Sequence, residues 1–337
     1  MFNFEKPKAL LESCPVYKAT PMQEAFVNKQ KLIIKDESER MGLGSFKALG
    51  GFYAVAQLIA MQTRQTFAPN EYLSPTMKAT AKYMVFVCAS AGNHGISVAV
   101  GAKIFGARCR IHLAKNVPEE FAIRLRAQGA EVIRSGKTYE DSVSIAMVDA
   151  KNLNAIHLAD SSWPGYTEIP RLVMEGYTVI AEEMRQEFEA KNTWPTHVYL
   201  QAGVGGLAAA MCFMIRHNWA VQPKITVVEP EQAPCLSESV KHGKICTVNG
   251  KVSNMGRLDC KTPSLLAFEI LNNMADSFVT VSDQAALNAV SIAKDINIDT
   301  TPSGAAGLAA LLNELSTIDA NSLPLVIITE GDISANK

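Results

Sequence analysis

Short apolar runs rich in β-branched residues alternate along this chain with longer amphipathic stretches. Near-continuous apolar strands of this kind are typical of parallel sheets that are covered by helices on both faces. The stretches between them carry apolar residues at helical spacing. The alternation therefore predicts an α/β fold built on parallel sheets.

The same patterns predict approximate bounds for the elements. We expect strands at residues 32–35, 84–89, 108–113, 131–134, 155–157, 197–201, 224–229 and 325–329. We expect helices at residues 47–62, 95–104, 118–128, 139–152, 167–190, 207–217, 282–295 and 305–315. Residues 65–81 are polar without a clean period and are predicted to be a connection, and residues 243–260 a surface loop or hairpin.

Four of the predicted strands follow one another closely between Met84 and His157. With 337 residues, the chain is long enough for two domains. We therefore predict a small inserted α/β domain at residues 76–160, and a large discontinuous domain at residues 1–75 and 161–337.

Composition excludes several classes of function. The net charge is −1 and no run of Lys or Arg occurs, so nucleic acid and anionic membranes are not expected partners. We predict neither a signal peptide nor a membrane span, because no apolar stretch follows the N-terminus and the longest uncharged stretch holds polar residues and glycines. Seven cysteines without a Cys-x-x-Cys pair predict free thiols in a reducing compartment, hence the cytoplasm, and no metal site is expected.

Lys47 follows a charged, glycine-bearing loop and opens an apolar helix that begins near Phe46. The N-terminus of a helix favours anions, so a lysine there is poorly placed for ordinary stability. The same positive field helps to make an amine nucleophilic. Lys47 is therefore a candidate for Schiff-base chemistry, and the alternative is a solvated surface lysine.

Two strand-to-helix turns are rich in small residues. In residues 88–95, backbone N–H groups can face a substrate carboxylate, although a plain tight connection fits as well. In residues 201–207, glycines permit the close approach of a phosphate. That turn has a rival interpretation, because Gly203, Gly205 and Ala208 fit a loose dinucleotide fingerprint, with Glu229 at the end of the next predicted strand.

Residues 44–47, 90–95 and 203–206 resemble the lysine motif, the substrate loop and the phosphate cup of fold-type II enzymes that use pyridoxal 5′-phosphate (PLP). Residues 40–47 and 160–170 also resemble phrases of the diaminopropionate ammonia-lyases, and the likeness runs from Pro21 to Asp332. The resemblance implies two domains, each a twisted and mostly parallel sheet covered by helices, with the active site between them. It also suggests a homodimer.

The resemblance assigns roles to particular residues. The cofactor contacts would be Lys47, Phe46, Asn93, Gly203, Val204, Gly205, Gly206, Leu207 and Thr329. The substrate contacts would be Ser90, Ala91, Gly92, His94, Asp160 and Ser303. Lys47 would be the Schiff-base lysine and the base for the L-isomer, and Asp160 would bind the β-ammonium, unless it only caps the next helix. A hydroxyl at Thr329 suits the ring nitrogen and leaves it largely unprotonated, although an ordinary strand residue fits there too.

Two departures from the family's pattern bear on the substrate. Ala91 stands where the family usually has an aspartate that serves as base for the D-isomer, and Pro302 where it tends to have a glutamate. The expected reaction is elimination from 2,3-diaminopropionate, with the L-isomer favoured, to pyruvate and ammonia. The alternatives are a serine or threonine dehydratase or β-replacement enzyme, and, from another class, a nicotinamide-binding oxidoreductase or a binding protein without activity.

Overall fold

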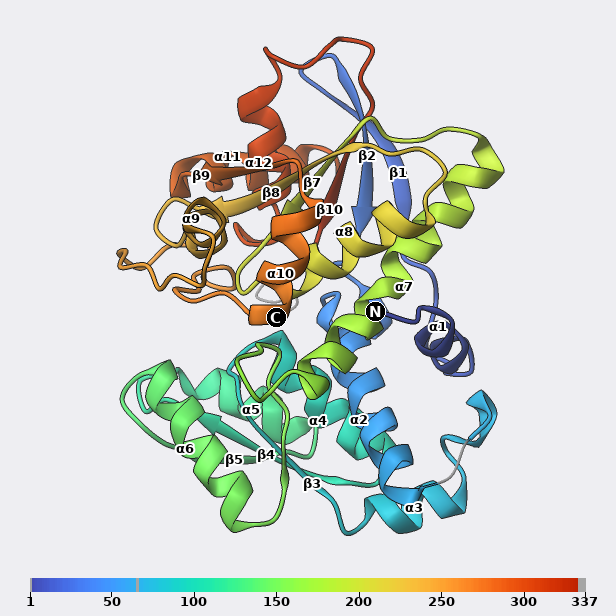
Figure 1. Ribbon diagram of the computed structural model, residues 1–337, viewed down its shortest axis with the longest axis vertical. Helices are drawn as coiled ribbons and strands as arrows, with labels where there is room; N and C mark the ends of the chain where they lie inside the picture. The colour runs from blue at the N-terminus through green and yellow to red at the C-terminus, as the bar shows by residue number, and fades with distance from the viewer. Residues whose placement is uncertain (1, 65–66, 333–337) are drawn as a thin grey trace. The chain divides into compact units, whose positions relative to one another are not determined.

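The computed structural model describes residues 2–64 and 67–332 (Figure 1). The strands are β1 Met22–Val27, β2 Gln30–Asp36, β3 Val85–Ala89, β4 Arg108–Leu113, β5 Glu131–Arg134, β6 Ile156–His157, β7 His197–Gln201, β8 Lys224–Pro230, β9 Ser277–Val281 and β10 Pro324–Ile328. The α-helices are α1 Glu5–Glu12, α2 Lys47–Thr63, α3 Pro75–Ala81, α4 Asn93–Phe105, α5 Glu119–Ala127, α6 Tyr139–Asn152, α7 Glu168–Lys191, α8 Gly206–Asn218, α9 Cys235–His242, α10 Leu265–Met274, α11 Asp283–Asp295 and α12 Ala306–Glu314. The predicted α/β class is confirmed.

The chain divides into two compact units. Unit 1 consists of the residues up to Tyr17, Lys47–Asp160 and Glu168–Gly176. Unit 2 consists of Lys18–Phe46, Ser161–Thr167 and the residues from Tyr177 onward. The domain bounds that we drew from the sequence stay a prediction.

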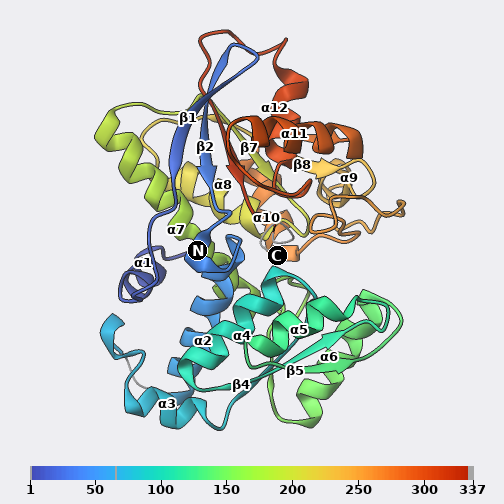
Figure 2. The ribbon, with the colours of Figure 1, turned by 180° about the vertical axis from the view of Figure 1, so that it is seen from behind.

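Unit 1 is built on a parallel sheet with the strand order β5-β4-β3-β6. Val87 and Ala89 of β3 pack against Ala146 and Ala150 of α6 on one face of this sheet. Helices α4 and α5 cover the other face, as both views of the ribbon show (Figures 1 and 2). The compact run of strands predicted between residues 84 and 157 is therefore confirmed.

Helices α2 and α4 of unit 1 approach each other at small residues. A side chain at Gly51 would place its Cβ 2.3 Å from Ser97 Oγ. The Ser97 hydroxyl donates in turn to the carbonyl oxygen of Ala48, at 3.1 Å. Because a Cβ cannot fit there, glycine lets the first turn of α2 lie against α4, and Lys47 begins that turn.

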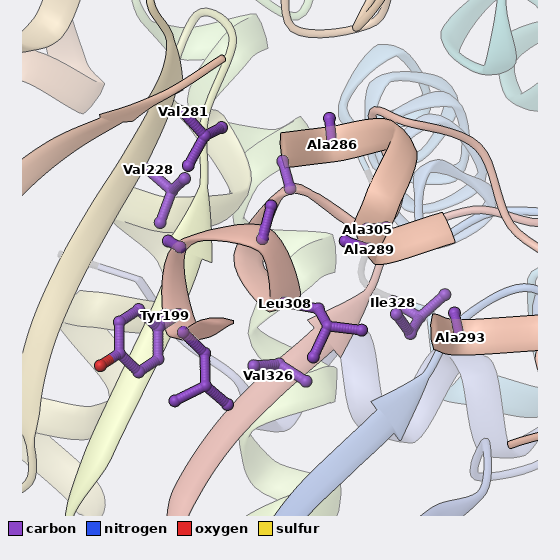
Figure 3. Close-up of a cluster of buried hydrophobic side chains, with 14 of the residues drawn as sticks. Tyr199, Val228, Val281, Ala286, Ala289, Ala293, Ala305, Leu308, Val326 and Ile328 are labelled. Atoms are coloured by element: carbon purple, nitrogen blue, oxygen red, sulfur yellow. The ribbon is translucent and has the colours of Figure 1, made fainter. Parts of the chain in front are cut away.

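Unit 2 is built on a sheet with the strand order β1-β2-β10-β7-β8-β9. All neighbouring strands are parallel except β1, which pairs antiparallel with β2 at the edge. On one face, Tyr199, Val228 and Val326 from three strands pack against Ala286 of α11 and Leu308 of α12 (Figure 3). The predicted parallel sheet is thus correct for every strand pair except the one that contains β1.

Several elements were not expected from the sequence. These are β1, β9, α1, α3, α9 and α10. Helix α3 falls inside residues 67–81, where we expected only a connection, and the Ser74 hydroxyl caps it by accepting from the backbone N–H of Met77. Residues 65 and 66 of that prediction lie outside the described residues. Residues 243–260 form a loop, as predicted.

A buried ionic network lies at the start of the turn that leads from β2 to Phe46. The Arg40 guanidinium makes two hydrogen bonds to Glu37, at 2.6 and 2.7 Å, and two to Glu183 of α7, at 2.7 and 2.8 Å. Lys35 donates to Glu183 at 2.6 Å and to the carbonyl oxygen of Thr20 at 2.8 Å. We name Lys35, Glu37, Arg40 and Glu183 the Arg40 network; it holds two cations and two carboxylates, so its formal charge is balanced.

None of the helices in residues 2–64 and 67–332 has the length and apolar character needed to cross a membrane. In the same residues, no group of three or more His, Cys, Asp or Glu side chains is placed to hold a metal ion. All seven cysteines are free thiols.

Candidate active site

The turn before Lys47 has an unusual backbone conformation. Met41, Gly42 and Gly44 all have positive φ angles, of 53°, 69° and 81°. The end of this turn is tied to the residues after β10, because the Phe46 N–H donates to the Thr329 carbonyl and the Gly331 N–H to the Gly44 carbonyl. Unit 2 therefore fixes the backbone up to Phe46 at both ends, since the Arg40 network holds the beginning of the turn.

Lys47 is the first residue of α2, and its side chain meets Asp160 within unit 1. The amine donates to Asp160 Oδ2 at 2.5 Å, and the two side chains are 20% and 19% exposed. Burial alone would raise the pKa of the Asp160 carboxyl, but the charge of Lys47 and its hydrogen bond hold this pKa well below its usual range. Asp160 does not cap the next helix, because α7 begins at Glu168 after Thr167.

The predicted substrate loop lies between β3 and α4 in unit 1, and α4 begins at Asn93, two residues earlier than expected. Ser90 Oγ accepts from the N–H groups of Gly92 and Gly95, at 3.2 and 3.1 Å. His94 is buried, and its Nε2 lies 2.9 Å from the Leu158 carbonyl oxygen, which identifies that nitrogen as the protonated one. Burial lowers the pKa of His94. The charge of Asp160 raises this pKa, and the charge of Lys47 lowers it.

The glycine turn of unit 2 lies between β7 and α8. A Cβ at Gly203 would come within 3.0 Å of the Arg257 carbonyl oxygen, and Gly205 has a φ angle of 97°. Only glycine satisfies both positions. Gly205 is the N-cap residue of α8 and has no side chain with which to cap it, which suits the first N–H groups of the helix to an anion.

Thr329 follows β10 and is 4% exposed. Gln201, the last residue of β7, donates to its hydroxyl from Nε2 at 3.3 Å. The predicted site residue Ser303 is also buried, and its Oγ accepts from the backbone N–H of Arg257 at 3.1 Å. Phe46 packs edge-on against Tyr177, with ring centroids 4.9 Å apart.

The carboxylate of Glu229 bears on the dinucleotide interpretation. It is fully buried and accepts hydrogen bonds at 2.7 Å from the N–H groups of Leu236 and Ser237, at the start of α9. Burial raises the pKa of Glu229 to about 7. A carboxylate that is committed to a helix N-terminus cannot bind a ribose hydroxyl, so the fingerprint lacks its acidic partner.

The predicted site residues thus form two groups. Unit 1 brings together Lys47, Asp160 and the loop of Ser90, Ala91, Gly92, Asn93 and His94. Unit 2 holds Phe46, Ser303, Thr329 and the turn of Gly203, Val204, Gly205, Gly206 and Leu207. Gln201 and Arg257 were not predicted as site residues. Gln201 stands directly before the glycine turn, but its contact with Thr329 spans 128 residues and no local pattern indicates it.

The residues present fit a PLP molecule in three respects. The uncapped helix and the two glycines suit its phosphate. The buried Thr329 hydroxyl suits its ring nitrogen, and in unit 1 the Lys47 amine, one-fifth exposed, is the group that forms a Schiff base with an aldehyde. The donor set therefore matches the polar groups of the cofactor.

Comparison with known proteins gives consistent results. The family model described as "Pyridoxal-phosphate dependent enzyme" matches residues 14–330. The diaminopropionate ammonia-lyase of Escherichia coli (strain K12) is 33% identical over 321 residues, which cover 90% of this chain and 80% of that protein. The diaminopropionate ammonia-lyase of Salmonella typhimurium (strain LT2) is 32% identical over 356 residues, which cover 97% and 88%.

A solved structure is similar over nearly the whole chain. It is the diaminopropionate ammonia-lyase of Escherichia coli in complex with an aminoacrylate-PLP azomethine reaction intermediate. It matches with a TM-score of 0.87 and 28% sequence identity, and the match covers 99% of this chain and 89% of that chain. The fold-type II architecture expected from the sequence is therefore confirmed.

Proposed function

We propose a lyase function for this chain, which belongs to the pyridoxal-phosphate-dependent enzymes and, within them, to the family of the diaminopropionate ammonia-lyases. The reaction begins with loss of the α-proton of L-2,3-diaminopropionate and expulsion of its β-amine. One water molecule then completes the conversion to one pyruvate and two ammonia. The observation that carries the proposal is the contact between Lys47 and Asp160 in unit 1.

PLP supplies an electron sink for the charge that develops at the substrate α-carbon. Lys47 would hold the cofactor covalently, Asn93 would bond to its phenolic oxygen, the glycine turn would bind its phosphate, and Thr329 would meet its ring nitrogen. Phe46 sits at the edge of the same site. The Arg40 network and the bond from Phe46 N–H to the Thr329 carbonyl support this assignment, because they fix the backbone on which these groups stand.

Lys47 Nζ takes the α-proton of the L-isomer. Asp160 binds the β-ammonium, which is the role suggested by a carboxylate that already accepts from an amine at 2.5 Å. Ser90, Ala91 and Gly92 before α4 and His94 in its first turn receive the substrate carboxylate, and Ser303 lines the site. The β-ammonium of the substrate would give the charged Asp160 carboxylate a cationic partner, whereas a neutral β-hydroxyl would not. The carboxylate therefore favours a cationic β-substituent.

A second candidate function is elimination of water from serine or threonine, or β-replacement on a related amino acid. Ala91 supports it, because an apolar methyl stands where the family usually has a carboxylate. Pro302 supports it in the same way. Under this candidate, Asp160 serves only to hold Lys47.

The test is pyruvate release by the purified, PLP-loaded protein from L-2,3-diaminopropionate and, in parallel, from L-serine. Faster release from the diamine supports the ammonia-lyase proposal, whereas release from serine alone moves the protein to the dehydratases. We expect activity on D-2,3-diaminopropionate to be absent or at least about a hundredfold lower, because Ala91 cannot accept a proton. Comparable turnover of both isomers would contradict that expectation, and Ala91→Asp should raise the D-activity.

We further propose a cytoplasmic homodimer. The free cysteines support the compartment, and family likeness supports the dimer. Sedimentation of the loaded protein at several concentrations tests the dimer, and a monomer at every concentration would contradict it.

A further inference from the structure

Gln201 joins three parts of unit 2 through one amide nitrogen. Its side chain is buried, and Nε2 lies 2.8 Å from the Gly304 carbonyl oxygen, 2.8 Å from the Ile327 carbonyl oxygen and 3.3 Å from Thr329 Oγ1. Carbonyl oxygens only accept hydrogen bonds, so the atom between these two must be the amide nitrogen and not the amide oxygen.

The Thr329 hydroxyl therefore has a restricted orientation. An amide nitrogen carries hydrogens and offers no lone pair to a donor, so the hydroxyl hydrogen cannot point at Gln201 Nε2, the Gln201 atom with which Thr329 makes its hydrogen bond. The Thr329 side chain is only 4% exposed. Within residues 2–64 and 67–332, no group accepts its hydroxyl hydrogen. Buried hydroxyl hydrogens are normally bonded, so this one indicates an acceptor on a bound molecule.

We propose that Gln201 is a positioning residue that forces the Thr329 hydroxyl to act as a donor, and thereby keeps the ring nitrogen of bound PLP unprotonated. This inference rests on the proposed function, in which Thr329 meets that nitrogen. A protonated ring nitrogen would be a donor too, and it would leave the Thr329 hydrogen buried without an acceptor. An unprotonated nitrogen makes the cofactor a weaker electron sink, which favours prompt loss of the β-group over transamination or racemisation.

A purely structural role for Gln201 is the competing explanation. Its amide also ties the turn at Gly304 to strand β10, and a Cβ at Gly307 would come within 2.9 Å of Gln201 Oε1, so glycine leaves room for the side chain. A structural role predicts that Gln201 variants lose stability and cofactor together. It does not predict a change in the state of the ring nitrogen.

The test is ¹⁵N NMR of the protein loaded with PLP that is ¹⁵N-labelled at the ring nitrogen. We expect the wild type to show an unprotonated, hydrogen-bonded nitrogen. Gln201→Met keeps the side-chain length but removes both hydrogens, so the freed carbonyl oxygens of Gly304 and Ile327 compete for the Thr329 hydrogen. The resonance should then shift to that of a nitrogen without a hydrogen-bond donor, or to a protonated one.

Gln30→Met is the matched control. Gln30 is buried in the same unit, and its Nε2 also donates to two carbonyl oxygens, of Lys31 at 2.9 Å and Ser322 at 2.7 Å. This variant loses the same chemical group away from Thr329, so its ring-nitrogen resonance should stay at the wild-type position. An equal shift in both variants would overturn the proposal.

Gln201→Glu is a second variant that keeps the shape of the side chain and offers an oxygen to the Thr329 hydrogen. It should lose the hydrogen bond at the ring nitrogen as Gln201→Met does, with kcat lowered about tenfold and KM little changed, as for one lost hydrogen bond. In a Thr329→Val background, Gln201→Met should not shift the resonance further. If both Gln201 variants fail to bind PLP while Gln30→Met binds it, Gln201 is only structural and the proposal is wrong.

The outcomes separate this proposal from the proposed function. A wild-type protein that shows the hydrogen-bonded nitrogen but releases no pyruvate would refute the ammonia-lyase reaction and leave the role of Gln201 intact. A wild-type protein that releases pyruvate with a protonated ring nitrogen would refute the role of Gln201 and leave the reaction intact.

Discussion

Two lysine–carboxylate pairs in this chain have nearly the same length and opposite surroundings. Lys35 and Glu183 are 2.6 Å apart with side chains 2% and 8% exposed. Lys47 and Asp160 are 2.5 Å apart with side chains 20% and 19% exposed. Distance alone therefore does not distinguish a structural ion pair from the pair that we propose for the active site.

The difference lies in what else each carboxylate binds and in access. Both oxygens of Glu183 accept from Arg40, and Lys35 also donates to the Thr20 carbonyl, so the pair is closed by partners on every side. Asp160 and Lys47 each keep about one-fifth of their side-chain surface exposed. A buried carboxylate that is fully paired resists the exchange of its partner. In a partly exposed pair, a substrate group can replace the lysine as the partner of the carboxylate.

The largest expected effect is the loss of activity in Lys47→Ala. Pyruvate formation should fall by at least about a thousandfold, because the variant lacks both the covalent anchor and the base. Its unfolding midpoint in urea should fall less than that of Lys35→Met, because Lys47 and Asp160 are each about one-fifth exposed. Lys35→Met should show the reverse pattern, with kcat of the folded protein retained and stability lowered, and a matching loss of kcat in both variants would break the comparison.

The next effect is on stability. Glu183→Gln leaves two buried cations with one carboxylate, so the free energy of unfolding should fall by about 3–5 kcal/mol. Glu187→Gln is the control on the same helix, since Glu187 pairs with the exposed Lys191 and should lose at most about 1 kcal/mol. Urea denaturation measures both, and equal losses would show that burial of the Arg40 network carries no special weight.

Asp160→Asn sharpens the functional side of the comparison. It keeps the shape of the side chain but loses the charge, so kcat/KM for L-2,3-diaminopropionate should fall about a hundredfold. For L-serine, whose β-substituent is neutral, the fall should be less than about tenfold. An equal fall for both substrates would indicate that Asp160 acts through Lys47 alone.

The smallest effect is in the pH dependence of stability. Burial works against both charged carboxyls, but Arg40 and Lys35 lower the pKa of Glu183, and Lys47 lowers that of Asp160. A carboxyl with a lowered pKa stabilises the fold above its ordinary pKa and loses this contribution as the pH falls. The stability gap between the wild type and Glu183→Gln should therefore narrow as the pH falls below about 4. A gap that widens on acidification would contradict the direction of the pKa shift.

The sequence predicts the central elements well because their signals are local. Strands such as β7 and β8 have a largely apolar, buried centre. The helices that alternate with such strands carry apolar residues at helical spacing. The two edge strands of the unit 2 sheet, β1 and β9, were missed, and for β1 the reason is physical. β1 carries the polar residues Gln23 and Glu24 near its start and exposes Phe26, so it lacks the continuous buried apolar run that marked the others.

The residues of the candidate site also divide into those that a local motif predicts and those that it does not. Lys47 and the glycine turn are short motifs that can be read in the sequence without a structure. The Arg40 network joins residues 143 and 148 positions apart, and the amide of Gln201 reaches Thr329 across 128 residues. Such contacts depend on strand order, and no pattern within a few residues encodes it.

The place of β10 in the sheet of unit 2 has a consequence for how the chain is made. β10 lies between β2 and β7, and Leu325 pairs with Ile33. On the ribosome, β2 is therefore synthesised long before its central neighbour exists, whereas the strands of the unit 1 sheet all lie between residues 85 and 157. We expect unit 1 to acquire its sheet during translation, and unit 2 to keep an unfilled gap until residue 328 has emerged.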